Sequence, residues 1–346
     1  MKNACTSERF TARCALCKPM PTRQAGLTLV ELLVAMAISA VIAIAAISAL
    51  IVSRQGFTTV DAASQLRENA RFATDLIQRL GVQAGFLDVA FSATTRPACI
   101  PPGCVLPDPN VNGFNNAKAS PTAPYNTPVA WTASDIGRGS DVLILRYQAA
   151  ETFSGSGVLD NTMIDCAGNP ATAVPQNRDD RMVSVLHVAA SSDGEPSLMC
   201  TTPIASGGFN TPQPVVRGVE SFQVLYGVSG VTPGTAPTGT PNSVPDRYLR
   251  ADQMVVPGNL AATNENWKRV RSLRIGMVLR GPVGSAQESL ASTYYPLGLA
   301  KDSATGTPGS AMSSANDPGT VFAPGADTRL RQTVTFTLHL RNNLGL

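Results

Sequence analysis

A single carboxylate interrupts the longest apolar stretch of the sequence. Glu31 is the only formally charged residue between Leu27 and Val52, in the run LTLVELLVAMAISAVIAIAAISALIV. An acid at the centre of a bilayer costs on the order of 2.5–3.5 kcal/mol on insertion scales, so such a residue is a functional-site hypothesis by default. Glu31 lies about one helical turn inside the stretch, where the simpler interpretation is an acid tolerated near the membrane surface.

The segment that carries Glu31 is long enough to cross a membrane. Its length of about 26 residues corresponds to a helix of roughly 39 Å. Five basic residues and one acid precede it, which predicts a cytoplasmic N-terminus and export of the chain after Val52. The basic residues are Lys2, Arg9, Arg13, Lys18 and Arg23, and the acid is Glu8. No small-residue cleavage site of a secretory signal follows the run.

The helix is expected to continue beyond the apolar run as an amphipathic segment. Apolar residues recur there every three or four positions: Phe57, Val60, Ala63, Leu66, Ala70, Ala73, Ile77 and Leu80. Charged residues lie between them, and those at Arg67, Glu68 and Arg71 are interpreted as a solvated face. The pattern predicts one long rod that ends near Gly81 and Gly85.

The seven cysteines fall into two groups. Cys5, Cys14 and Cys17 precede the apolar run, while Cys99, Cys104, Cys166 and Cys200 follow it. Four cysteines beyond a membrane segment suit an oxidising compartment, and the pairs Cys99–Cys104 and Cys166–Cys200 are the expected disulfides among three connectivities. The Cys14–Cys17 spacing resembles half a zinc site, but no second pair accompanies it, so no metal is predicted.

No catalytic motif stands out from the sequence. It contains no Gly-x-Ser-x-Gly elbow, no phosphate-binding loop, no Gly-x-Gly-x-x-Gly and no His-Glu-x-x-His. The two histidines, His187 and His339, are isolated, and Asp179 and Asp180 lie in a loop-like segment. The net charge of +3 is too small to indicate the basic surface of a nucleic-acid-binding protein. We therefore predict no catalytic residue, no cofactor and no nucleic-acid partner.

The remainder of the chain is expected to form β-strands separated by long loops. Alternating apolar and polar residues predict strands at 141–147, 182–188, 220–228, 272–280 and 333–341. In the last of these, Val334, Phe336, Leu338 and Leu340 share one face, which predicts an antiparallel sheet with one buried and one wet face. Segments 92–134, 229–245 and 281–328 are rich in Pro, Gly, Asn and Thr and predict loops. Trp131 and Trp267 are expected to anchor a core or an interface.

The residues around Glu31 resemble the class III signal of type IV prepilins and pseudopilins. Gly26 stands directly before the apolar run, LTLVE follows it, and a basic leader precedes it. The resemblance implies that a prepilin peptidase cuts between Gly26 and Leu27 and that the new amine is methylated. Glu31 then occupies the fifth mature position, where its carboxylate would pair with the amine of a neighbouring subunit and fix the register between packed helices.

Four further segments resemble the PilW family of minor pilins. They are 67–86, 215–228, 267–280 and 329–342, and they include Arg-Glu-Asn-Ala-Arg-Phe and Gly-Val-Glu-Ser. The implied fold is α+β, with one long N-terminal helix packed on an antiparallel sheet. The expected divisions are a leader (1–26), a transmembrane half-helix (27–52), an amphipathic half-helix (53–85) and a periplasmic or extracellular β-rich domain (86–346).

The resemblance also implies a function. A PilW-type minor pilin would help to initiate pili at or near the tip and support twitching motility and adhesion. Its partners would be other minor pilins, the major pilin, a tip adhesin-like protein and the inner membrane, before it reaches the pilus at the cell surface. The alternatives are a J-type minor pseudopilin of a type II secretion system and a membrane-anchored periplasmic adhesin or enzyme.

Overall fold

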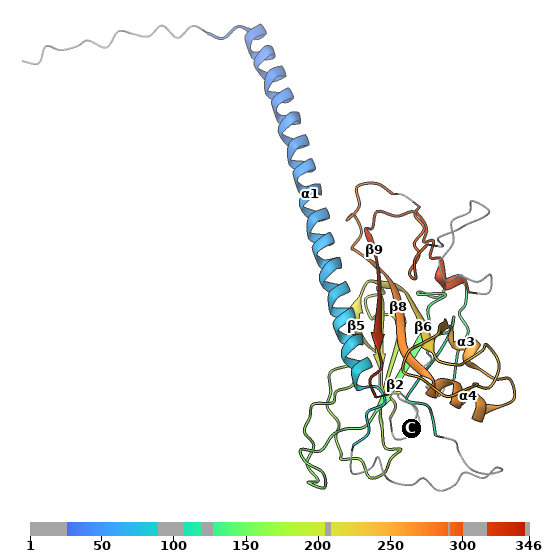
Figure 1. Cartoon of the computed structure of the whole chain (residues 1–346). Coiled ribbons are helices and arrows are strands. Elements are labelled where there is room, and N and C mark those ends of the chain that lie inside the picture. Colours follow the sequence, from blue (N-terminus) through green and yellow to red (C-terminus); the bar gives the residue numbers. More distant parts are fainter. Residues whose placement is uncertain are drawn as a thin grey trace, which may run out of the picture. The chain divides into compact units, whose positions relative to one another are not determined.

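The computed structural model describes residues 26–88, 107–119, 127–204, 209–289, 291–299 and 317–342. The chain divides into two compact units, one ending at Arg54 and the other covering Gln55–Leu346. A single long helix, α1, begins in the first unit and ends in the second (Figure 1). The predicted α+β class, with a long N-terminal helix and antiparallel sheets, is confirmed.

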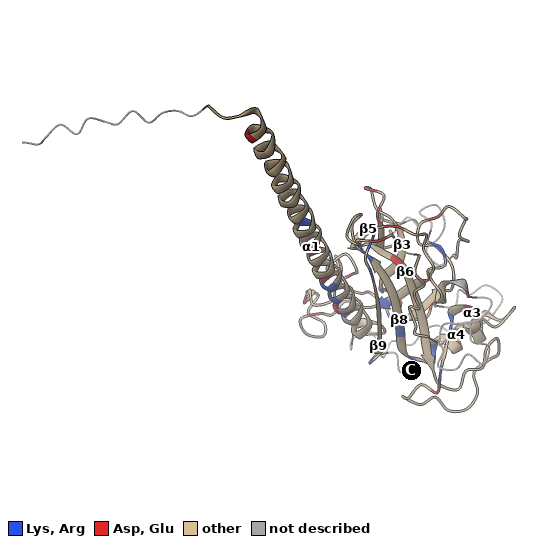
Figure 2. Ribbon diagram, turned by 90° about the horizontal axis from the view of Figure 1, so that it is seen from above, with Lys and Arg blue, Asp and Glu red and all other residues tan. Residues whose placement is uncertain are grey.

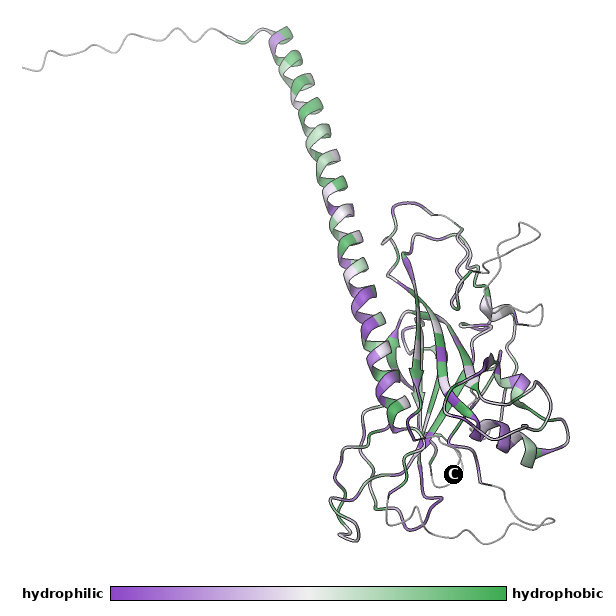
Figure 3. Cartoon of the chain, viewed as in Figure 1, coloured by the Kyte–Doolittle hydropathy of each residue, from purple (hydrophilic) through white to green (hydrophobic). Residues whose placement is uncertain are grey.

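The helix α1 spans Leu29–Gln83, with 55 residues and no proline. Every residue from 26 to 55 is exposed, and the helix is long and apolar enough to cross a membrane. Figure 3 shows its first half as almost uniformly hydrophobic and its second half as mixed. The helix ends where Gly85 adopts a positive φ of 79°, close to the predicted boundary.

The second half of α1 packs on the strands through a stripe of small and branched side chains. The buried stripe consists of Ala62, Leu66, Ala70, Ala73, Ile77, Leu80 and Gly81. At Gly81 the backbone approaches so closely that an added Cβ would lie 2.4 Å from Leu338. Phe57 and Val60, which begin the predicted apolar repeat, are exposed, and the buried stripe begins at Ala62.

Two antiparallel sheets replace the single expected sheet. The first has the order β1-β2-β3-β4-β5, and the second has the order β7-β6-β8-β9. The first sheet contains β1 (Val111–Phe114), β2 (Val142–Tyr147), β3 (Met182–Ala190), β4 (Pro196–Thr201) and β5 (Gln213–Arg217). The second contains β6 (Val219–Val228), β7 (Arg247–Leu249), β8 (Val270–Arg280) and β9 (Arg331–His339). The short helices are α3 (Ala251–Met254), α4 (Leu260–Lys268) and the 3₁₀ turn η1 (Pro318–Thr320).

The expectation of one wet face per strand holds only at a sheet edge. Along β9 the side chains of Thr333, Thr335 and Thr337 are exposed, while those of Val334 and Phe336 are half-buried. By contrast, β2 and β6 are buried at every position, and β8 at nine of its eleven. These central strands are covered on both faces, so polar residues at alternate positions also lie inside the protein.

The two sheets join through one residue between β5 and β6. Gly218 has a φ of +81°, and an added Cβ would lie 2.5 Å from the carbonyl oxygen of Arg280. Its N–H donates to the carbonyl of Pro196 in the first sheet, and its own carbonyl accepts from Arg280 N in the second. Glycine is needed here because the chain turns left-handed while it bonds to both sheets.

A network of three arginines and three acids surrounds this junction. Glu220 in β6 accepts from Arg280 Nη1 at 2.9 Å and from Arg331 Nε at 2.6 Å. Glu195 forms ion pairs with both Arg280 and Arg329. Arg331 forms a further ion pair with Asp327. Arg280 and Arg331 face each other across β8 and β9, so Glu220 neutralises two like charges that would otherwise repel.

The arginines lower the pKa values of Glu195 and Asp327, the two acids of the network other than Glu220. Burial raises the pKa of Glu195, but hydrogen bonds and charges from Arg280 and Arg329 outweigh it and hold the pKa below its ordinary value. Hydrogen bonds from Arg331 lower the pKa of Asp327. The stabilisation from both acids is therefore complete above their ordinary pKa values, near 4, and is lost as the pH falls below them.

Glu220→Ala is expected to destabilise the fold by about 1.5–3 kcal/mol, because it removes the acid that Arg280 and Arg331 share, although each guanidinium keeps its outer acid. Chemical denaturation followed by tryptophan fluorescence measures this. Asp75→Ala, which breaks an exposed pair with Arg71, is the control and should change stability by less than about 0.5 kcal/mol. Equal effects of the two variants would contradict the proposed importance of the network.

The buried imidazole of His187 in β3 makes stability depend on pH. It is 3% exposed, its Nε2 lies 2.8 Å from Thr201 Oγ1, and its Nδ1 has no partner among the described residues. Burial lowers its pKa from 6.5 to about 4. Between these values the unfolded chain takes up a proton and the folded chain does not, so stability falls as the pH falls.

His187→Leu is expected to remove a loss of stability that reaches roughly 3 kcal/mol between pH 6.5 and pH 4. The free energy of unfolding at pH 7 and at pH 4.5 gives the comparison. His339→Leu is the matched control, because His339 is exposed on β9, and it should keep the acid sensitivity of the parent. Retention of the full pH dependence in His187→Leu would refute the assignment.

Candidate assembly site

The start of α1 is closed by a reciprocal pair of hydrogen bonds between Thr28 and Glu31. Thr28 N donates to Glu31 Oε2 at 2.9 Å, and Glu31 N donates to Thr28 Oγ1 at 3.3 Å. Thr28 Oγ1 also donates to the same carboxylate oxygen at 3.0 Å. This is a capping box, in which Thr at the helix cap and Glu three residues later satisfy each other's backbone N–H groups.

Sequence reasoning missed Thr28, although the signal was present. The spacing Thr-x-x-Glu directly before an apolar run is the sequence pattern of a capping box. It gives Glu31 a local role that differs from both earlier interpretations, a tolerated acid and an assembly residue. The cap uses only one of the two carboxylate oxygens, because no described residue donates to Oε1. Glu31 can therefore cap its own helix and still bind a second donor.

The residues next to the capping box are open to a partner. Leu27 is 78% exposed, and Leu29 and Val30 are 74% and 67% exposed. Nothing lies within 4 Å of the position of a Cβ on Gly26. The described part of the chain does not cover the Gly26–Leu27 peptide bond. Exposed apolar side chains of this size need a lipid or protein surface against them.

Charged residues are concentrated on the second half of α1, as Figure 2 shows. Arg71 and Asp75 form an exposed i,i+4 pair at 3.8 Å, and Arg67 and Glu68 are also exposed. Such pairs contribute little to stability. Phe72 lies among these charged residues and is 54% exposed, so this outer face combines charge with apolar surface.

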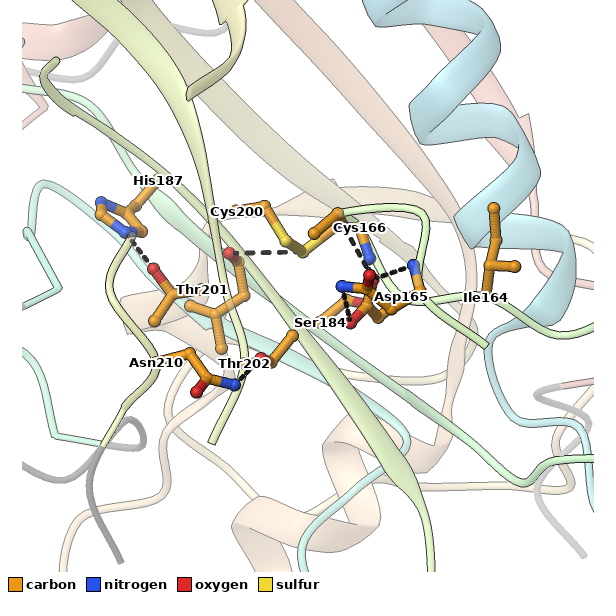
Figure 4. The surroundings of a disulfide bond; sticks show 12 residues. Ile164, Asp165, Cys166, Ser184, His187, Cys200, Thr201, Thr202 and Asn210 are labelled. Atoms are coloured by element: carbon orange, nitrogen blue, oxygen red, sulfur yellow. Dashed lines mark hydrogen bonds between the residues drawn. A yellow bond between two sulfur atoms is a disulfide. The ribbon is translucent and has the colours of Figure 1, made fainter. Parts of the chain in front are cut away.

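The predicted Cys166–Cys200 disulfide is present in the structure. It joins the loop before β3 to β4, with Cα atoms 5.5 Å apart and 34 positions between the two residues. Figure 4 shows the bridge beside Ser184, whose Oγ accepts from Cys166 N at 3.0 Å. In the chain-entropy model, a loop of this length stabilises the fold by about 4 kcal/mol. The expected Cys99–Cys104 pair and the Cys14–Cys17 spacing lie outside the described residues.

The other residues singled out from the sequence belong to the second unit. Trp267 is 4% exposed and packs edge-on against Tyr226 at 4.8 Å, as expected for a core anchor. Trp131 donates to the carbonyl of Ser140 at 3.1 Å. Asp180 accepts from Gln176 N within its own loop. Among the described residues, no group of three or more His, Cys, Asp or Glu side chains is arranged to hold a metal.

Thr28→Val is expected to destabilise the first turn of α1 by about 1 kcal/mol, because it removes the hydroxyl that caps Glu31 N. Amide hydrogen exchange of Leu29–Leu32 in nanodiscs measures this as faster exchange. Thr58→Val is the control, because Thr58 Oγ1 donates to the carbonyl of Gln55 inside the helix and caps nothing. Unchanged exchange in Thr28→Val would show that the capping box contributes nothing.

Two family models match separate parts of the chain. The model described as "Prokaryotic N-terminal methylation motif" matches residues 21–47 and includes Thr28 and Glu31. The model described as "Type IV Pilus-assembly protein W" matches residues 185–342, which contain all six members of the ion network. No curated protein matches the chain.

One solved structure with detectable similarity is a type IV-like pilin from Thermus thermophilus. Its sequence is 11% identical, the similarity covers 82% of this chain and 97% of that chain, and the TM-score is 0.33. A likeness of this degree adds nothing to the assignment, which rests on the two family models and on the capped apolar helix. The chain thus carries an N-terminal methylation motif at the start of its apolar helix and a region, residues 185–342, that is similar to the PilW family of type IV pilus-assembly proteins.

Proposed function

We propose that this protein helps to initiate the assembly of type IV pili and is incorporated at or near the pilus tip, where it supports twitching motility and adhesion. Prepilin peptidase cuts between Gly26 and Leu27, and the new amine of Leu27 is methylated. Before assembly the chain is held in the inner membrane by α1, with its N-terminus in the cytoplasm. After assembly it belongs to the pilus at the cell surface.

The observation that carries the proposal is the open oxygen of Glu31. Oε2 is used by the cap of its own helix, whereas Oε1 accepts from no described residue. Cleavage after Gly26 creates an ammonium at Leu27, four positions from the carboxylate. When subunits pack side by side, the ammonium of one can bind Oε1 of the next. Each charge then offsets the cost of the other inside lipid, and the pairing sets the axial register.

The exposed helix surface supports a structural role in place of a catalytic one. The described part of the chain does not cover the apolar half of α1, so this half must bind lipid before assembly and other helices afterwards. Its partners are other minor pilins and the major pilin through helix packing, and a tip adhesin-like protein through the β-rich unit. A J-type minor pseudopilin uses the same helix chemistry, and a neighbourhood of secretion genes would favour that alternative.

Glu31→Gln separates the two roles of the carboxylate. A glutamine at this position keeps the capping box but has no charge to pair with an ammonium. We expect Glu31→Gln to insert and be processed normally but to lower surface piliation and twitching at least about tenfold, as Glu31→Ala should. Asp61→Ala, which removes an exposed acid from the second half of α1, is the control and should assemble normally.

Intact mass spectrometry of the purified protein tests processing independently. A mature chain that begins with N-methyl-Leu27 is expected, in the parent and in all three variants. A chain that retains Met1 would refute the pilin-type pathway and favour a membrane-anchored enzyme or adhesin. Full piliation in Glu31→Gln would refute the assembly role and show that Glu31 acts only as a helix cap.

A further inference from the structure

A cavity of about 710 Å³ lies between β1, α3 and α4 in the second unit. Its size falls within the range of ordinary small-molecule sites. One wall is formed by the edge strand β1 and the residues just before it, and the other by the first turns of α4 and the segment that follows α3. Nothing in the proposed assembly mechanism uses this cavity.

The polar side chains of the cavity are two carboxylates, four carboxamides, the hydroxyl of Thr263 and the indole of Trp267. Asp108 and Asp252 line it, together with Asn112, Asn115 and Asn264. Both carboxylates are already neutralised, because Asp108 binds Arg146 at 3.0 Å and Asp252 binds Arg250 at 2.9 Å. No lysine or arginine is among the described lining residues. The cavity therefore offers an anionic ligand no lysine or arginine among its described lining residues, because both nearby arginines already bind its carboxylates.

The amides have hydrogen-bonding capacity left over. The Oδ1 atom of Asn115 is buried and has no partner among the described residues. Asn264 uses its Nδ2 to bind the carbonyl of Pro107 at 3.3 Å, which leaves its oxygen as an acceptor. Asn112 Oδ1 accepts from Arg146 Nη1, which leaves its Nδ2 as a donor. Asn115 Oδ1 has almost no exposed surface, so a ligand in the cavity does not reach it. The free oxygen of Asn264 and the free Nδ2 of Asn112 are the amide groups that a ligand hydroxyl can bind.

Apolar side chains are interspersed with these polar groups on both walls. Phe114 lies on the β1 wall, and Val255, Val256 and Leu260 lie on the other, with Leu260 63% exposed at the rim. A ligand that fits must present hydroxyl groups, each both donor and acceptor, together with C–H groups. From this geometry we infer that the cavity between β1 and α4 binds a neutral saccharide of about two or three sugar rings.

Binding can be tested with the full chain in nanodiscs, which avoids competition from glycoside detergents. The probes are maltotriose, N-acetylchitotriose and lactose, with 3′-sialyllactose as the anionic match to lactose. Saturation-transfer NMR and calorimetry should detect at least one neutral probe and weaker binding of 3′-sialyllactose than of lactose. Leu260→Arg and Val255→Arg, both at exposed rim positions, should each weaken binding at least about tenfold.

Val283→Arg is the matched control, because Val283 is 70% exposed and lies outside the cavity; it should bind like the parent. Circular dichroism shows whether each variant is folded. The inference is overturned if no neutral probe binds at ~10 mM, a concentration that would reveal millimolar affinity. It is also overturned if both rim variants bind as well as Val283→Arg, if 3′-sialyllactose binds more tightly than lactose, or if a neutral Gly/Asn pentapeptide displaces the sugar.

Discussion

The Thr28–Glu31 capping box is the contact on which both proposed roles of α1 depend, as a membrane anchor before assembly and as a packing element afterwards. A helix start in or near lipid must satisfy its first N–H groups without water, and a carboxylate there must find donors. The two residues meet both needs within one chain, and they use only one carboxylate oxygen. In the proposed assembly, the acid is satisfied within its own chain and keeps one oxygen for the amine of a second subunit.

In the second unit, the strands are held together by ion pairs between arginines and acids, and not by a helix cap. Arg280, Glu220 and Arg331 lie at or near the ends of strands: Glu220 and Arg331 near the starts of β6 and β9, and Arg280 at the end of β8. In the structure they hold β6, β8 and β9 together beside Gly218, where the chain passes from one sheet to the other. The six charged groups balance one another, three positive and three negative, so the junction is ionic without a net charge.

Periodicity predicted the elements that repeat regularly, and it failed where burial came from other parts of the chain. The five strands expected from alternation all exist, and α1 ends where Gly81 and Gly85 indicated. The single sheet with a wet face was wrong because central strands such as β8 are covered on both sides, which no local pattern reveals. Strands β1, β4, β5 and β7 were missed because they are short or lack alternation. Thr28 was missed because the sequence analysis considered the charge of Glu31 and not the Thr-x-x-Glu spacing of a capping box.

The two family matches leave residues 48–184 outside both models. This part of the chain includes the second half of α1, β1, β2 and one of the two disulfide cysteines. The saccharide cavity takes one wall from β1, outside the matched region, and the other from α3 and α4, inside it. The wall from α3 and α4 supplies Asp252 and Asn264, and the segment around β1 supplies Asn112 and Phe114. Ligand preference would then depend on the amides of Asn112 and Asn264, because Phe114, Leu260 and Val255 contribute only apolar contact.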